Sequence, residues 1–251
     1  MAAAVRAQSV SKWFPLRDGE SLHVLQGVDI EVEERSVAAI VGASGCGKST
    51  LLNIIAGLIP PDRGEVFLNG VPSKSFTEWR SLTYMFQDDR LLPWRTAAQN
   101  VAFGLEAAGA PRAERRERVA ETLALVGLAD FAEAYPHELS GGMRSRVALA
   151  RSLVTRPSIL LMDEPFSKLD PSIRSQMHDE VLRVAGLMGM TIVFVTHDVE
   201  EAVVLADTVV TLKPRPGRVQ ETHVINLPHP RDPLSAEVAE RARLLRRSLQ
   251  S

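Results

Sequence analysis

Short apolar runs separated by turn residues are the main pattern along this chain. Several runs are nearly continuous in valine, isoleucine and leucine, which is typical of parallel strands buried on both faces. The runs that predict strands are 28–32, 37–41, 65–68, 82–86, 158–162, 191–195, 208–212 and 218–224. Helical patterns alternate with the later runs, so the sequence predicts an α/β fold with a mainly parallel sheet. The early part has fewer helices, and an antiparallel β portion is expected there.

The middle of the chain shows only helical patterns, at residues 96–108, 112–126 and 141–154. Further helices are expected after the strands on either side, at 48–56, 173–188 and 200–205, the last of them short. The simplest account is a helical subdomain inserted into an α/β core. The predicted division is a core of residues 1–87 and 155–225, a helical subdomain of 88–154 and a helical tail of 226–251.

The tail has two interpretations. Apolar residues recur at helical spacing from Leu234 to Leu249, with several arginines around them. The simpler interpretation is a C-terminal helix packed on the core. The alternative is a basic amphipathic segment that contacts a membrane surface.

Composition narrows the class of protein. The 251 residues include 45% hydrophobic and 24% charged residues, as in an ordinary folded domain. A formal net charge of −2 gives no general reason to expect nucleic-acid binding. The single cysteine excludes an intramolecular disulfide and suits a reducing compartment. No apolar run approaches the ~20 residues that span a bilayer, so work at a membrane would require an embedded partner.

Residues 41–50, VGASGCGKST, carry the clearest chemical signal. They follow a predicted strand and open a predicted helix, so the pattern G-x-x-x-x-G-K-[ST] indicates a phosphate-binding loop. Glycines let backbone N–H groups turn toward an anion, and the helix adds the positive end of its dipole. Lys48 is expected to reach the β- and γ-phosphates, and Ser49 to ligate Mg²⁺. The residues predicted to cradle a nucleoside triphosphate are Gly42, Ala43, Ser44, Gly45, Cys46, Gly47, Lys48, Ser49 and Thr50.

The cysteine inside this loop also has two interpretations. Cys46 lies at a helix N-terminus, where a thiolate is favoured, so it is expected to react with a maleimide unless ATP covers it. The alternative is a small buried filler without reactivity.

Two further stretches complete the predicted site. Residues 159–164, ILLMDE, form an apolar strand that ends in two carboxylates, where open α/β sheets place ligand chemistry. Asp163 would hold Mg²⁺, and Glu164 would act as general base toward the attacking water. Residues 139–143, LSGGM, begin a helix with Ser140 as its N-cap. Gly141 and Gly142 would free backbone amides there to approach phosphate.

Together these motifs resemble the ATPase subunits of ATP-binding-cassette (ABC) transporters. The motifs GASGCGKS, MFQDD, LSGGM, LLMDEP, SKLD and VTHD occur in the order of that family, over about residues 5–225. The resemblance implies a P-loop nucleotide-binding core with an inserted helical subdomain. It also implies that two domains pair head to tail, with each ATP between the phosphate loop of one and the LSGGM segment of the other.

The resemblance assigns further roles. Phe14 matches the aromatic residue that stacks on adenine, although the adjacent Trp13 could do the same. Gln87 matches the residue that senses Mg²⁺ and the attacking water. His197 matches the residue that contacts the γ-phosphate and orients the catalytic groups, and Asp170 lies in the loop that crosses the dimer interface.

Residues 87–94, QDDRLLPW, look like the importer subfamily that serves nitrate, alkanesulfonates, taurine and related solutes. Leu91, Leu92 and Trp94 are candidates to grip a helix of a membrane permease; the alternative is that they pack inside the helical subdomain. Lys168 departs from the family, because it replaces the small residue usual before Asp170. This replacement is expected to alter how the two subunits communicate.

The sequence therefore predicts an ATP-hydrolysing importer subunit that uses ATP and Mg²⁺ and dimerises around two ATP. It would lie peripherally on the cytoplasmic face of the inner membrane. Its expected partners are a second copy or a homologous ATPase subunit, permease subunits and, indirectly, an extracytoplasmic solute-binding protein, but no nucleic acid. The alternative is a non-transport ABC ATPase that acts as a scaffold or regulatory module. Such proteins carry a long heptad insertion or two cassettes in one chain, and neither is visible here.

Overall fold

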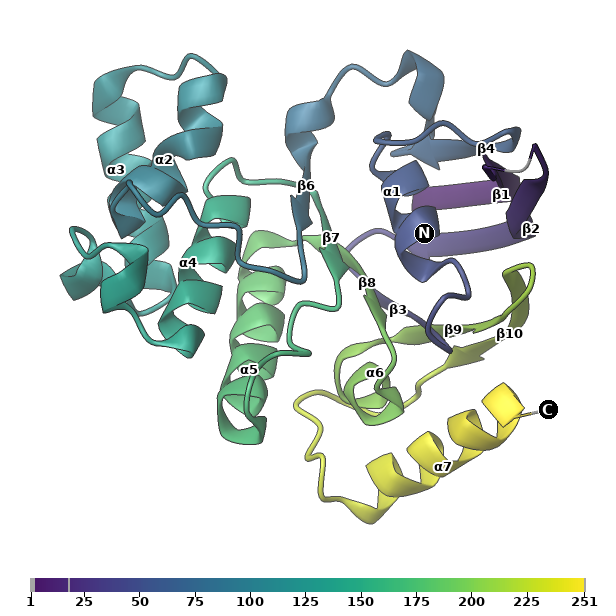
Figure 1. The fold of residues 1–251 in the computed structure, drawn as a ribbon. Helices are drawn as coiled ribbons and strands as arrows, with labels where there is room; N and C mark the ends of the chain where they lie inside the picture. The colour runs from purple at the N-terminus through teal and green to yellow at the C-terminus, as the bar shows by residue number, and fades with distance from the viewer. Residues whose placement is uncertain (1–2, 18, 251) are drawn as a thin grey trace. The chain divides into compact units, whose positions relative to one another are not determined.

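The computed structural model describes residues 3–17 and 19–250, and it has the predicted α/β fold (Figure 1). Every predicted strand and helix is present, with ends that shift by a few residues except where β2 begins earlier. The elements in chain order are β1 (Ala3–Pro15), β2 (Ser21–Glu33), β3 (Val37–Gly42), α1 (Lys48–Ile55), β4 (Arg63–Leu68), β5 (Val71–Pro72), η1 (Ser73–Ser75), η2 (Trp79–Ser81), β6 (Leu82–Met85), α2 (Ala97–Ala107), α3 (Arg112–Leu125), η3 (Ala129–Phe131), η4 (Pro136–Glu138), α4 (Gly141–Leu153), β7 (Ile159–Asp163), α5 (Pro171–Met188), β8 (Thr191–Thr196), α6 (Val199–Leu205), β9 (Thr208–Lys213), β10 (Arg218–Val224) and α7 (Ala236–Gln250).

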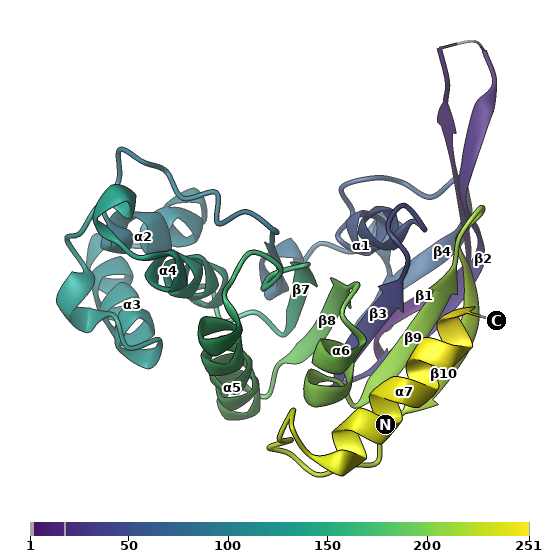
Figure 2. The same ribbon diagram turned by 60° about the horizontal axis from the view of Figure 1, so that its bottom comes forward.

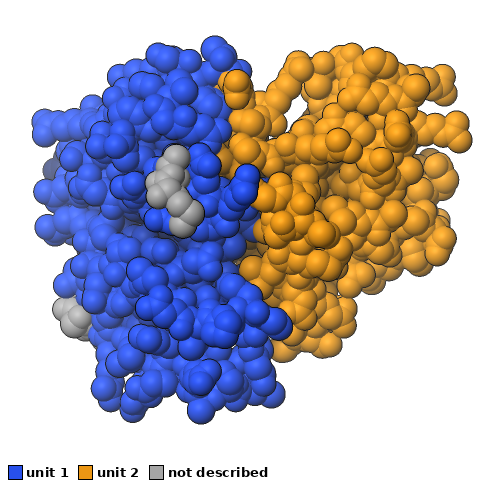
Figure 3. Space-filling view, turned by 180° about the vertical axis from the view of Figure 1, so that it is seen from behind, with its two compact units in different colours: residues 1–77, 190–251 blue, residues 78–189 orange. Residues whose placement is uncertain are grey.

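The chain divides into two compact units (Figure 3). Unit 1 comprises residues 1–77 and 190–251, and unit 2 comprises residues 78–189. Unit 2 therefore holds β6, β7 and α5 together with the helices of the predicted subdomain. The predicted domain division at residues 87, 154 and 225 stays a prediction.

Unit 1 contains two groups of hydrogen-bonded strands. In one of them β3 lies between β8 and β9 and is parallel to both, while β10 is antiparallel to β9. All residues of β3 and β8 are buried, which is why both appear in the sequence as continuous apolar runs. Helices α1 and α6 contact these strands, so the core of unit 1 lies between the strands and the helices.

The expected antiparallel β portion is the other sheet of unit 1, with the strand order β2-β1-β4-β5. Its strand β1 is absent from the prediction. The register of β1 against β2 shifts between Ala7 and Val10, where Ser9 has a φ of 48°. Such a bulge breaks the two-residue alternation by which a strand is recognised in a sequence.

Unit 2 combines a parallel strand pair with a helical layer. Strands β6 and β7 pair in parallel, with Leu82 opposite Ile159 and Met85 opposite Met162. Helices α2, α3 and α4 contact one another in the same unit. Thr96 caps α2 by accepting from the Gln99 backbone N–H, and the Gln99 side chain accepts from the Thr96 N–H in return.

The C-terminal tail forms a helix on unit 1. Helix α7 contacts α6 and β9 along its length (Figures 1 and 2). Its buried side chains are Val238, Ala242 and Leu245, which belong to the apolar series seen in the sequence. Leu234, the first member of that series, precedes the helix and is 92% exposed. The packed helix is therefore the arrangement observed. Across the described residues, 3–17 and 19–250, no helix has the length and apolar character needed to cross a bilayer.

A buried arginine joins this tail to the rest of unit 1. The guanidinium of Arg231, whose residue is 7% exposed, donates to the carbonyl oxygens of Val203 and Ala206 at 2.6 Å each. It also donates to those of Ile225 at 3.2 Å and Leu227 at 2.9 Å. The carbonyls at the end of α6, which have no partner within the helix, thus receive their hydrogen bonds from the tail.

We expect Arg231→Ala to lower the free energy of unfolding by about 3 kcal/mol, because buried carbonyls lose a charged donor. Urea denaturation followed by circular dichroism measures the change. Arg243→Ala is the control, since that guanidinium is exposed and pairs with Glu240 one turn away. The control should leave the denaturation midpoint unchanged. Equal midpoints for both variants and the unmodified protein would show that the Arg231 contacts do not stabilise unit 1.

Candidate functional site

The predicted phosphate loop follows β3 and leads into α1. Gly45 and Gly47 have φ values of 77° and 98°, in the left-handed region that disfavours residues with a Cβ. Gly42 has another constraint, because a Cβ there would lie 2.7 Å from the Sγ of Cys46. The backbone of this loop therefore needs glycine at each of these three positions.

A lysine ammonium is held on the same loop. Lys48 is 5% exposed, and its Nζ donates to the carbonyl oxygens of Gly42 at 2.8 Å and Ala43 at 3.1 Å. The loop thus combines a fixed positive charge with the N-terminus of the eight-residue helix α1, which together suit a phosphate group. Around it, Thr50 is partly buried, and the exposed residues are Ala43, Ser44, Gly45 and Ser49.

The structure favours the second interpretation of the loop cysteine, a buried side chain without reactivity, over a reactive thiolate. Cys46 is 1% exposed, and burial raises the pKa of its thiol, although the nearby Lys48 charge acts in the opposite direction. Desolvation disfavours the thiolate more than the lysine charge favours it. The alternative of a small buried side chain is therefore the observed one.

Cys46 should react slowly with a maleimide at about pH 7, with or without ATP, because a raised pKa keeps the thiol protonated there. The labelling rate should climb only at a pH above the ordinary thiol range, about 8.5. Mass spectrometry across this pH range measures the rate, and the urea-unfolded chain is the rapidly labelled control. Fast labelling of the folded protein at neutral pH, suppressed by ATP, would support the interpretation of Cys46 as a reactive thiolate.

In unit 2, the strand β7 delivers the two predicted carboxylates. Asp163 is its last residue, and the Oδ2 of Asp163 accepts a hydrogen bond of 3.2 Å from the hydroxyl of Tyr84 on β6. Glu164 follows with a φ of 45°, a left-handed conformation that costs about 1 kcal/mol for a residue with a side chain. The turn is held because the Glu164 carbonyl accepts from the backbone N–H and the hydroxyl of Ser167, at 3.3 and 3.0 Å.

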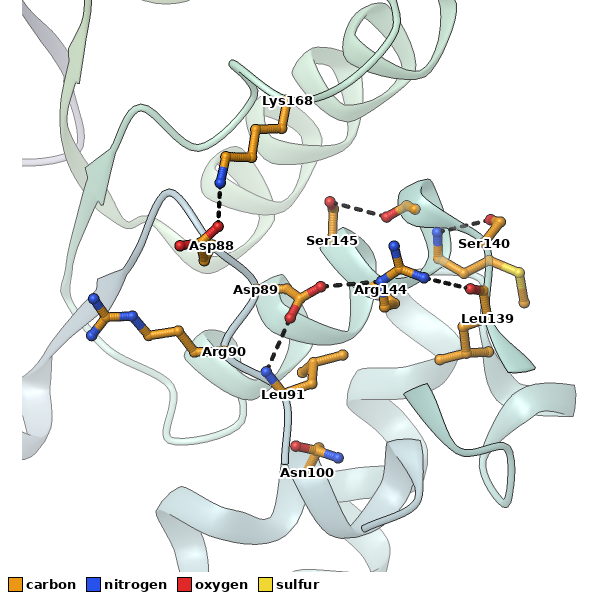
Figure 4. A network of polar contacts seen from close by, with 12 residues as sticks. Asp88, Asp89, Arg90, Leu91, Asn100, Leu139, Ser140, Arg144, Ser145 and Lys168 are labelled. Atoms are coloured by element: carbon orange, nitrogen blue, oxygen red, sulfur yellow. Dashed lines mark hydrogen bonds and ion pairs between the residues drawn. The ribbon is translucent and has the colours of Figure 1, made fainter. Parts of the chain in front are cut away.

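The structure brings residues 87–90 after β6, the Gln87 loop, against the segment that follows Glu164. The exposed Gln87 donates from Nε2 to the Oγ of Ser167 at 3.2 Å. Lys168 forms an ion pair with Asp88 (Figure 4). Lys168, the residue that departs from the family pattern, therefore contacts a residue of its own unit. Nothing in the sequence spacing pointed to this pair.

The LSGGM segment begins α4 as predicted. Ser140 is the N-cap, and its Oγ accepts from the Met143 N–H at 3.2 Å (Figure 4). Gly141 is exposed, and a Cβ there would make only an ordinary contact of 3.9 Å with the Nη2 atom of Arg144. Gly142 is needed for packing, because a Cβ there would lie 2.8 Å from the Cγ2 of Ile173 on α5.

An arginine that the sequence did not single out links this segment to the Gln87 loop. Arg144 Nε pairs with the Oδ2 of Asp89 at 3.2 Å, and another of its nitrogens donates to the Leu139 carbonyl at 2.8 Å (Figure 4). Arg151, two turns further along α4, donates to the carbonyls of Asp89 and Arg90 at 2.5 and 2.7 Å. Two consecutive residues of the loop are thus held by the helix that LSGGM begins.

Three predicted residues lie at the ends of elements. Phe14 is partly buried near the end of β1, and Trp13 points to the opposite strand face with its ring stacked on His23 at 4.2 Å between centroids. His197 is exposed and directly follows β8. Asp170 caps α5, since its Oδ1 accepts from two backbone N–H groups at 3.1 Å each. Their predicted roles toward a nucleotide remain predictions.

The donors for a cation are oxygen atoms. In the part of the chain that the structure describes, no group of three or more His, Cys, Asp and Glu residues gathers to hold a metal ion. The Ser49 hydroxyl and the Asp163 carboxylate are hard ligands of the kind that Mg²⁺ takes together with phosphate oxygens. Each of these two side chains therefore has an oxygen donor of the type that suits a magnesium ion.

The proposed partner contact needs one correction. Leu91 is 9% exposed and belongs to the core, whereas Leu92 is partly buried and Trp94 is 71% exposed. The fully buried Asn100 fixes this segment by accepting from the Leu92 N–H at 2.7 Å and donating to the Arg95 carbonyl at 3.0 Å. The structure therefore presents an exposed indole on a segment that is held by hydrogen bonds.

Comparison with known proteins agrees with this geometry. The ABC transporter family model matches residues 25–167. The chain is 46% identical over 215 residues to the taurine import ATP-binding protein TauB of Rhizobium johnstonii, covering 86% of this chain and 81% of that protein. It is 45% identical over 219 residues to the aliphatic sulfonates import ATP-binding protein SsuB 1 of Xanthomonas axonopodis pv. citri, covering 87% and 86%. The structure resembles the dimeric post-hydrolysis state of the ATP-binding cassette MJ0796 bound to ADP and Pi, with a TM-score of 0.77 and 30% identity over 89% of this chain and 99% of that chain.

Proposed function

Because the chain belongs to the ABC transporter family and is an ATP hydrolase coupled to transport, we propose that it energises an importer of small sulfonates. Its relatives named for taurine and aliphatic sulfonate import support this solute class, and the stretch QDDRLLPW supports the same subfamily, which also includes nitrate importers. The observation that carries ATP binding is the loop in which Gly45 and Gly47 take left-handed conformations and Lys48 is held by two carbonyls.

The proposed roles in unit 1 concern the nucleotide. The backbone N–H groups of the loop and the Lys48 ammonium bind the phosphates, since both are fixed before the ligand arrives. Phe14 stacks on the base, because the ring of Trp13 is already occupied by His23. His197 orients the γ-phosphate from the end of β8.

The proposed roles in unit 2 concern the cation and the water. Asp163 and Gln87 are the ligands that unit 2 would offer to Mg²⁺, and Ser49 is the ligand that unit 1 would offer. The ion would supply positive charge to the phosphates. Glu164 accepts a proton from the attacking water. Glu164 has a left-handed backbone conformation that Ser167 stabilises, and this conformation fixes the direction in which the side chain extends from the backbone.

The second binding surface for ATP is proposed to come from another copy of the chain. Ser140, Gly141 and Gly142 of the partner copy would meet the γ-phosphate, and Asp170 would lie at the interface. The dimeric state of the similar cassette supports this arrangement. The other proposed partners are permease subunits at the cytoplasmic face of the inner membrane, with a solute-binding protein outside it.

A scaffold or regulatory ABC ATPase remains the competing function. Taurine and alkanesulfonate uptake by a strain that lacks this subunit separates the two. Loss of uptake, restored by the unmodified gene, supports the importer. Normal uptake of taurine, alkanesulfonates and nitrate together with loss of an unrelated phenotype would support the scaffold.

Glu164→Gln should retain ATP binding and lower hydrolysis by about 10²–10⁴-fold, because the amide cannot accept the proton from water. Phosphate release measures hydrolysis, a fluorescent ATP analogue measures binding, and size-exclusion chromatography should show an ATP-bound dimer. Glu237→Gln, an exposed position on α7, is the control. Turnover of Glu164→Gln within about tenfold of the unmodified protein, ~1.4 kcal/mol in barrier height, would remove Glu164 from this role.

Trp94→Ala should abolish transport by the reconstituted complex and leave the ATPase rate of the isolated subunit intact. An aromatic anchor at an interface contributes more than ~2 kcal/mol, and this indole is exposed on a fixed segment. Phe131→Ala, which alters another exposed aromatic residue of unit 2, is the control. If both transport and ATPase survive in Trp94→Ala, the permease contact lies elsewhere.

A further inference from the structure

The hydroxyl of Tyr84 contacts a carboxylate to which the proposed function assigns the cation. Tyr84 lies on β6, whose residues pair in parallel with those of β7, so its side chain reaches the end of the neighbouring strand. Its OH donates to the Oδ2 of Asp163 at 3.2 Å. Packing alone would be served as well by phenylalanine at this position, whereas the hydrogen bond needs the phenol.

The phenol ring itself is held in place. The Phe86 ring lies against it, with 4.5 Å between centroids, and the guanidinium of Arg90 lies 3.7 Å from the centroid of Phe86. The carbonyl of Arg90 in turn accepts from Arg151 on α4 at 2.7 Å. A continuous series of contacts within unit 2 thus runs from the helix that LSGGM begins to the Asp163 carboxylate.

We propose that Tyr84 is a positioning residue, which fixes the direction in which the Asp163 carboxylate faces the magnesium ion. The proposal rests on the assignment of Asp163 as a Mg²⁺ ligand. A carboxylate that ligates a metal can rotate about its side-chain bonds, and a hydrogen bond to one of its oxygens removes that freedom before the cation arrives. Because the Tyr84 ring packs against the tilted ring of Phe86, the donor does not move with the carboxylate.

The direct test is Tyr84→Phe, which removes one oxygen atom and keeps the ring. Electron paramagnetic resonance of Mn²⁺, with a non-hydrolysable ATP analogue present, measures cation affinity without turnover. We expect the dissociation constant for Mn²⁺ to rise about tenfold, as for other groups that orient metal ligands. Nucleotide affinity measured in EDTA should stay unchanged, because the hydrogen bond that is lost acts on the proposed cation ligand.

The chain offers a matched control, since Tyr135 is its other tyrosine. Tyr135→Phe, at a 40% exposed position beside His137, should leave the Mn²⁺ affinity unchanged. In steady-state assays of Tyr84→Phe, the Mg²⁺ concentration for half-maximal ATPase should rise more than the maximal rate falls. An unchanged Mn²⁺ affinity in Tyr84→Phe, or an equal loss in Tyr135→Phe, overturns the proposal.

A double-mutant cycle with Asp163→Ala separates positioning from a general structural role. Once the carboxylate is absent, Tyr84→Phe should cause no further loss of Mn²⁺ affinity, because the two residues act through one hydrogen bond. Additive losses, or loss of nucleotide binding in EDTA by Tyr84→Phe alone, contradict it. If the unmodified protein binds no Mn²⁺ in the presence of nucleotide, the proposed function is wrong. If the unmodified protein binds Mn²⁺ and Tyr84→Phe binds it equally well, only the role of Tyr84 is wrong.

Discussion

Burial of the parallel strands on both faces is the constraint on which the candidate site depends. A strand such as β3 or β8 has no solvent-facing side, so charged side chains appear only where such strands end. The phosphate loop follows β3, His197 follows β8, and Asp163 and Glu164 stand at the end of β7. Within each unit, the same apolar runs that form the core therefore place the chemistry at strand ends.

Polar contacts within unit 2 hold the Gln87 loop in place. Its three consecutive charged residues each contact a different partner. Asp88 pairs with Lys168, and Asp89 pairs with Arg144 (Figure 4). The guanidinium of Arg90 lies over the ring of Phe86. The Asp88 pair is exposed, where ion pairs add little stability. These contacts fix the geometry of the loop between LSGGM and the carboxylates. Their contribution to the geometry of the loop is therefore larger than their contribution to the stability of unit 2.

Burial can also reverse the charge state that the local position of a side chain favours. A helix N-terminus and a neighbouring lysine both favour a thiolate at Cys46, yet desolvation raises the pKa of its thiol. Arg231 shows the opposite balance, since several carbonyl oxygens compensate a buried charge. The outcome in each case depends on how many partners the folded chain brings to the group.

The sequence by itself determined the α/β fold, the phosphate loop, the two carboxylates and the LSGGM helix start. Each of these depends on residues close together in the chain: apolar periodicity, glycines at fixed offsets and a capping serine. It missed β1, because a bulge broke the alternation of its side chains. It also placed Leu91 at a partner surface, although that side chain is buried.

Only the tertiary structure decided the contacts between distant residues. Tyr84 meets Asp163 across 79 positions, and Arg144 meets Asp89 across 55. No spacing rule relates such residues, because their distance depends on which strands pair and which helix covers the loop. The sequence therefore identifies the groups that do the chemistry, and the packed fold decides which other side chains hold them in place.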